Sequence, residues 1–201
     1  MGEPGGDPWS MQITQTDADF YYALWIRDSL GITVPAGPLV PGHLTHRPPC
    51  HSDLIRGGSA EISAGWQAWW SDLARAAPSW DCATKYWDRA GAPYFDGLAE
   101  WPRLQSLSRI LWNEADHWFA EYKRSTMLAL ADRPSGVGPA ARAAADRLGH
   151  PIGDVHLDLI VVPVEGDRPL EVNRSRYIVP KDVYEHPAWH EVLVDMFVRA
   201  H

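Results

Sequence analysis

Prolines crowd one stretch of this chain, between residues 32 and 58, and they restrict what the chain can form there. The stretch contains Pro35, Pro38, Pro41, Pro48 and Pro49. Each proline lacks a backbone N–H and fixes φ, so neither a helix nor the interior of a sheet can run through the segment. We therefore predict a long Pro-rich loop. A loop of this length inside a compact domain is usually functional or a linker.

Five other segments have the apolar spacing of amphipathic helices. The first follows Asp17, a candidate N-cap, and stops at Gly31. The others are residues 59–77, a long helix from about residue 102 to 131, a short helix that ends at Gly149, and the C-terminal residues 186–201. The chain is therefore expected to be mainly helical.

Two segments near the C-terminus are rich in β-branched residues, 154–164 and 168–180, with Glu-Gly-Asp between them. A short glycine-containing turn between two such runs predicts an antiparallel β-hairpin over residues 155–179. Its alternation would place Leu157, Leu159 and Val161 on one face, packed on the C-terminal helix, and His156, Asp158 and Ile160 on the other. The predicted fold class is α+β, mainly helical, with this small C-terminal antiparallel hairpin or sheet.

The bulk properties limit the domain organisation and the class of partner. The 201 residues suit one α+β domain over residues 16–201, preceded by a Gly/Pro-rich tail, 1–15, that we expect to be disordered. The net charge of −8 argues against binding to nucleic acid or to an anionic membrane. The start lacks a basic and apolar leader, and no apolar run could span a bilayer, so we expect a cytoplasmic protein.

Histidine and cysteine cluster within the Pro-rich loop. His43, His46 and Cys50, with His51 beside them, offer imidazole and thiolate ligands of the kind that zinc prefers. The spacing is not that of a standard zinc finger, because prolines separate the ligands and no second ligand pair follows nearby. The alternative is a surface loop whose polar residues lie between prolines.

A second candidate site lies on the long helix. Glu114, His117 and Glu121 are three and four residues apart, so they project from one strip of that helix. Glu-x-x-His is half of the motif of di-iron carboxylate bundles, but the chain has no second copy on a helix. The alternative is a solvated helix edge on which His117 pairs with one of the two glutamates.

Tryptophan is unusually abundant, with 11 in the chain. Trp66 and Trp70 fall on the apolar face of their helix, beside Ile62 and Leu73, which predicts a place in the core. The competing interpretation is an aromatic surface that binds a partner, since tryptophan is enriched at interface hot spots. Trp112 lies at the margin of the apolar stripe of the long helix, so we expect it to be capped by a neighbour or exposed as an interaction anchor.

No complete catalytic motif is present in the sequence. We therefore predict a non-catalytic cytoplasmic protein that needs no cofactor and binds another protein through Trp112, Trp66 and Trp70, in an accessory, regulatory or inhibitor-like role. The alternative is a small metal-dependent enzyme that holds zinc with His43, His46 and Cys50 and uses Glu114, His117 and Glu121 as an acid–base strip.

Overall fold

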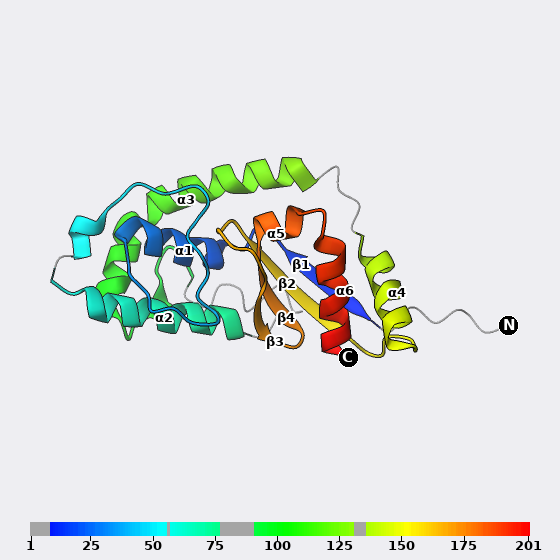
Figure 1. The fold of residues 1–201 in the computed structure, drawn as a ribbon. Helices are drawn as coiled ribbons and strands as arrows, with labels where there is room; N and C mark the ends of the chain where they lie inside the picture. Colours follow the sequence, from blue (N-terminus) through cyan, green and yellow to red (C-terminus); the bar gives the residue numbers. More distant parts are fainter. Residues whose placement is uncertain (1–8, 56, 77–90, 131–135) are drawn as a thin grey trace.

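The computed structural model describes residues 9–55, 57–76, 91–130 and 136–201, and it confirms a mixed α+β fold with mainly helical content. A four-stranded sheet has a hydrophobic core on each face. Helices α1 (Ala18–Leu30), α2 (Ser59–Arg75) and α3 (Pro102–Leu130) share one core with the sheet. Helices α4 (Val137–Leu148) and α6 (Trp189–Ala200) share the other (Figure 1).

The sheet has the strand order β1-β2-β4-β3 and is mixed. Its strands are β1 (Ser10–Thr14), β2 (His156–Val162), β3 (Leu170–Asn173) and β4 (Arg176–Pro180). β1 pairs with β2 and β2 pairs with β4, both in parallel, whereas β3 and β4 are antiparallel. The carboxyl ends of β1, β2 and β4 therefore point the same way.

The prediction of one antiparallel hairpin over residues 155–179 is wrong in its pairing. The second run breaks at Asn173, whose side-chain oxygen accepts the backbone N–H of Ser175 in an Asx turn. This turn makes a tighter hairpin of β3 and β4, and it leaves the other edge of β4 to pair in parallel with β2. Residues after β2 do not form the expected tight turn, because Pro163 O and Glu165 N bond to the Pro-rich loop.

The predicted alternation of faces in β2 is confirmed. Leu157, Leu159 and Val161 lie in the core shared with α6, together with Leu193, and Trp189 packs against its edge. Ile160 lies in the opposite core with α1–α3. The two faces of β2 are therefore both covered, as is usual for strands within a parallel arrangement.

The expected disordered tail is wrong for residues 10–14, which form β1. The backbone N–H of Ser10 donates to Val155 O at 2.8 Å, and the Ser10 hydroxyl lies 2.8 Å from His156 Nδ1. Pairing with β2 orders this segment, in which Met11 and Ile13 alternate with polar residues and pack against the core shared with α4 and α6. Residues 1–8 of the predicted tail lie outside the described residues.

The five predicted helices are confirmed, and a short helix, α5 (Lys181–Glu185), follows β4. Asp17 caps α1 by accepting the N–H groups of Asp19 and Phe20. Gly31 and Gly149 end their helices in the left-handed conformation, with φ of 64° and 76°. In the described ranges, no helix combines the length and hydrophobicity needed to cross a bilayer.

A buried ion pair fixes the Pro-rich segment onto α1. Arg27 donates to Asp28 Oδ1 at 2.7 Å and to the carbonyls of Pro41 and Gly42 at 2.8 and 2.7 Å. Asp28 in turn accepts the N–H of Leu44. Leu44 then forms an isolated antiparallel bridge with Val164, and residues 52–55 form the 3₁₀ helix η1 (Ser52–Ile55). The segment thus connects α1 to the chain that follows β2.

Candidate functional site: a cleft at the strand ends

The histidines and the cysteine of the Pro-rich segment have separate partners. His43 Nδ1 lies 2.9 Å from Asp28 Oδ1, His46 lies beside Thr45, and Cys50 Sγ is 3.3 Å from Ser52 Oγ. Within the part of the chain that the structure describes, no three His, Cys, Asp or Glu side chains are placed to hold one metal ion. The zinc site predicted at His43, His46 and Cys50 therefore gains no support from the geometry.

The three residues of the acid–base strip on α3 have different contacts. Glu114 Oε2 contacts His51 Nε2 of the Pro-rich segment at 2.9 Å. His117 Nε2 lies 3.5 Å from Glu121 Oε1, with both side chains more than half exposed. The three residues therefore do not converge on one point. The contact between Glu114 and His51 joins residues 63 positions apart, so the sequence pattern alone could not reveal it.

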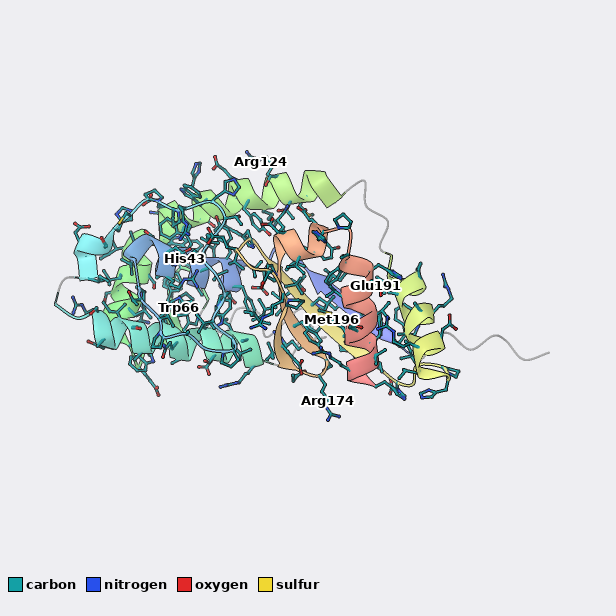
Figure 2. All side chains as sticks on the ribbon, in the orientation of Figure 1. His43, Trp66, Arg124, Arg174, Glu191 and Met196 are labelled. Carbon is teal, nitrogen blue, oxygen red and sulfur yellow. The ribbon has the colours of Figure 1, made fainter. Side chains whose placement is uncertain are left out.

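Two of the predicted interaction residues lie in the core instead of on a surface. Trp66 and Trp70 are 0% and 2% exposed, and their rings stack with centroids 5.5 Å apart. Trp66 Nε1 donates to Ala23 O, and Trp70 Nε1 donates to Leu39 O. Figure 2 shows Trp66 among the helices of the aromatic core. A partner cannot reach either ring without opening this core.

Trp112 is partly buried, between the two outcomes expected from the sequence. Its ring lies 4.9 Å from that of Tyr22 and 6.2 Å from that of Phe95. Both contacts are edge-on, the favourable geometry for aromatic pairs. Trp112 therefore caps the margin of the aromatic core and keeps part of its surface exposed.

The structure brings a different set of residues together, around a cavity of about 470 Å³ that we call the strand-end cleft. Pro163 follows β2 directly, and Lys181 and Asp182 follow β4 directly. The remaining lining residues come from α1, the Pro-rich segment and α3; they are Tyr21, Leu44, Thr45, His46, Trp118, Glu121, Tyr122 and Ser125. The cleft thus lies where the sheet, α3 and the loop meet.

The position of the cleft follows from the parallel pairing. Because β1, β2 and β4 run the same way, their carboxyl ends share one edge of the sheet. Open sheets with parallel strands bind their ligands in crevices at this edge. α3 is tied to the same edge, since the Tyr122 hydroxyl donates to the carbonyl of Gln15, the residue after β1, at 3.0 Å.

Aromatic rings form the fixed wall of the strand-end cleft. Tyr21 and Tyr122 stack with centroids 5.3 Å apart and an interplanar angle of 16°. Burial raises the pKa of both phenols above the usual value, and Tyr122 and Glu121 add to this effect at Tyr21. Both rings therefore stay neutral at ordinary pH. Trp118 supplies a third ring on the same side of α3.

Charged side chains lie at the rim of the strand-end cleft. Lys181 Nζ lies 2.6 Å from Glu185 Oε1, so its charge is balanced within α5. Glu121 contacts His117, which is exposed. Asp182 makes no ion pair with any residue that the structure describes. The rim therefore carries two carboxylates beside a lysine that is already neutralised.

On α3, Glu121 was predicted as a site residue, but Trp118, Tyr122 and Ser125 were not. Lys181 and Asp182 were not predicted either. One signal was available: the segment "YIVPKD" places two charged residues directly after an apolar strand. Its meaning depends on strand direction, since only in a parallel arrangement does that position lie at the ligand-binding edge. Comparison with models of protein families, with curated proteins and with solved structures finds no match for this chain.

Proposed function

We propose that this chain acts by binding and not by catalysis, and that its ligand occupies the strand-end cleft. The observation that carries the proposal is the combination of place and lining. A cavity of about 470 Å³ lies at the carboxyl ends of three parallel strands and has a wall of aromatic rings. Ligand sites of proteins have similar volumes, with mostly apolar walls and a few polar groups.

The polar groups of the strand-end cleft support a binding role. Catalysis by a nucleophile needs a hydrogen bond from that group to a base. The hydroxyl–histidine contact in the lining, Thr45 Oγ1 to His46 Nδ1, is long at 3.5 Å, and the same hydroxyl donates to Pro163 O. Lys181 is engaged by Glu185. These groups are placed to orient a ligand.

The ligand can be a free molecule or a side chain presented by another protein. The protein partner predicted from the excess of tryptophan therefore stays a prediction, and the binding point moves from Trp66 and Trp70 to the cleft. The cytoplasmic location also stays a prediction.

A thermal-shift screen of small molecules tests the proposal, with Ser125→Trp as the blocking variant. Ser125 lines the cleft and donates to Tyr122 O one turn back on α3. Ser106 offers a matched control, because it is exposed, donates to Pro102 O on the same helix and lies about 28 Å away along it. A ligand at 100 times its Kd stabilises the folded state by about 2.7 kcal/mol.

We expect compounds that raise the melting temperature of the wild type and of Ser106→Trp, with no effect on Ser125→Trp. Compounds that stabilise all three proteins equally would place the binding site elsewhere. A library in which nothing stabilises the wild type would remove the support for a ligand site in the cleft.

A further inference from the structure

We infer that the strand-end cleft takes an organic cation, an ammonium group carried on an apolar stem; this rests on the proposed function. The cleft combines the two features that recognise such a group. Trp118 and Tyr122 present partly exposed aromatic rings, with buried Tyr21 stacked on Tyr122, and Glu121 and Asp182 supply carboxylates. A cation over the face of a tryptophan or tyrosine is attracted by the ring quadrupole, more strongly when water is partly excluded.

The charge balance of the rim favours a cation over an anion. Lys181 is the cationic side chain of the lining, and its ammonium lies 2.6 Å from the Glu185 carboxylate. An anionic ligand would have to compete with Glu185 for this lysine and would face Glu121 and Asp182. Arg124 lies on the outer side of α3, away from the sheet (Figure 2). Among the described lining residues, the uncompensated charge is therefore negative.

The apolar part of the cleft fits the stem of such a ligand. Leu44 is 2% exposed and pairs with Val164 in an isolated bridge, and the N–H of Thr45 donates to Pro163 O, so Leu44 and Pro163 are both fixed in place. They line the same cleft as the rings of α3. A methylene chain laid between them removes apolar surface from water, while its ammonium end stays near the carboxylates.

The same chemistry can come from a free amine or from a lysine side chain of another protein. A free amine carries its stem alone, whereas a lysine brings a peptide backbone that must lie across the rim. The net charge of −8 suits a basic partner as well as a basic small molecule. The two sources therefore need separate probes.

Three six-carbon probes with one stem and different end groups test the inference by calorimetry: hexylammonium, hexanol and hexanoate. We expect hexylammonium to bind the wild type and Ser106→Trp but not Ser125→Trp. Hexanol should bind about tenfold more weakly, and hexanoate should not bind. Glu121→Gln and Asp182→Asn should each weaken hexylammonium about tenfold, the loss of one charge-assisted hydrogen bond.

Two variants separate recognition of charge from a general loss of structure. Glu191→Gln removes one carboxylate on the opposite side of the sheet, where Glu191 pairs with Arg147, and should leave hexylammonium binding unchanged. Trp118→Leu keeps an apolar wall and removes the ring, so the preference for hexylammonium over hexanol should fall but stay above onefold, because Glu121 and Asp182 remain. A damaged fold would weaken both probes equally and leave that ratio unchanged.

The outcomes also separate this inference from the proposed function. If hexanol or hexanoate binds as well as hexylammonium and Ser125→Trp blocks it, the cleft is a ligand site but the cation inference is wrong. If none of the probes binds, the inference is wrong, and the library screen decides the proposed function by itself. A Gly-Gly-Lys-Gly-Gly peptide that binds more tightly than hexylammonium, while its Glu counterpart does not bind, identifies a protein lysine as the source.

Discussion

The two sides of the sheet are built on different principles. On the side of α4 and α6, the core is mainly aliphatic, with Tyr177 and Phe197 as buried aromatic residues, and three alanines of α4 let the two helices approach closely; these are Ala140, Ala141 and Ala144. On the side of α1–α3, the core is aromatic and contains Trp25, Trp66 and Trp70 at 2% exposure or less. A buried tryptophan brings an N–H into the core, and Trp66 and Trp70 donate theirs to backbone carbonyls.

This difference explains why the irregular chain lies on the aromatic side. Trp70 donates its N–H to Leu39 O in the Pro-rich segment, and Arg27 lies over the Trp66 ring at 5.3 Å while it holds Pro41 and Gly42. Gly42 is needed at this point, because a Cβ would clash with Glu165 O. The loop thus serves as the polar partner of the aromatic core, and its residues 44–46 line the strand-end cleft.

Loss of a core tryptophan should have the largest effect. Trp66→Ala removes a ring that is 0% exposed, its hydrogen bond to Ala23 O and its contact with Arg27. Core truncations of this kind lower the free energy of unfolding by about 3 to 5 kcal/mol. Urea denaturation measures the change, with Trp66→Phe as the variant that keeps a ring and should lose less. A loss below about 1 kcal/mol for Trp66→Ala would contradict the aromatic core described above.

Breaking the buried ion pair should cost about 3 kcal/mol. Asp28→Ala leaves the Arg27 guanidinium buried without its carboxylate and leaves the Leu44 N–H without an acceptor. Burial alone would raise the pKa of Asp28, but the bonds from Arg27, Leu44 and His43 hold it below the usual value. The stability that Asp28 provides is therefore present above about pH 4 and lost as the pH falls through the lowered pKa.

The control for this ion pair lies on the aliphatic side. Asp195 contacts Arg147 at 2.5 Å, but both side chains are about half exposed. Asp195→Ala should therefore change the free energy of unfolding by less than about 1 kcal/mol, as for other surface pairs. Urea denaturation measures both changes. Equal losses of unfolding free energy for Asp28→Ala and Asp195→Ala would contradict the difference between the two sides of the sheet.

The helices could be predicted from the sequence because their signals are local. Asp17 and Gly31 lie within one turn of the ends of α1, and the capping contacts join residues at most five apart. The spacing of Trp66 and Trp70 on α2 also favoured the core, although we predicted both as interaction residues. Such features do not depend on what the rest of the chain does.

The sheet and the cleft could not be predicted because they depend on pairing over long distances. β1 pairs with β2 across 146 residues, and the alternation of Met11 and Ile13 with polar residues is too short to indicate where this strand pairs. The direction of β4 depends on the Asx turn at Asn173. We did not predict this turn, because the prediction treats residues 168–180 as one continuous strand. With the strands assumed antiparallel, Pro163 and Lys181 would not meet at one edge, so the cleft was hidden as well.

The partly buried carboxylate of Asp19, on the side of α1–α3, should make the stability of the protein depend on pH. Burial, and then the neighbouring Asp17 charge, raise the pKa of Asp19 to about 7. An unfolded aspartate has a pKa of about 3.9, so between these values the folded state binds more protons, and stability falls as the pH rises. Asp19→Asn removes this penalty and should raise the free energy of unfolding by about 2 kcal/mol at pH 8.

Melting curves between pH 4 and pH 8 check the Asp19 prediction. The advantage of Asp19→Asn should shrink as the pH falls from 7 to 4 and vanish below the unfolded pKa of about 3.9, where the wild-type carboxyl is protonated in both states. Asp195→Asn, on the aliphatic side, controls for the loss of one surface charge. An advantage that stays constant over this range would show that Asp19 ionises normally in the folded protein.

The smallest expected effect is a difference in unfolding free energy between the loss of Trp112 and the loss of Trp189, which lie at the margins of the two cores. Trp112 and Trp189 are both partly buried, but Trp112 meets the rings of Tyr22 and Phe95, whereas the ring contact of Trp189 is with Tyr184. Aromatic pairs add about 0.5 to 1.5 kcal/mol each beyond the area they bury. Trp112→Ala should therefore lower the free energy of unfolding by about 2 kcal/mol, and Trp189→Ala by about 1 kcal/mol. Equal losses of unfolding free energy would mean that the extra ring contact adds nothing.

A Trp112→Ala protein with unchanged stability would favour the sequence-based prediction that the exposed part of this ring anchors a protein partner.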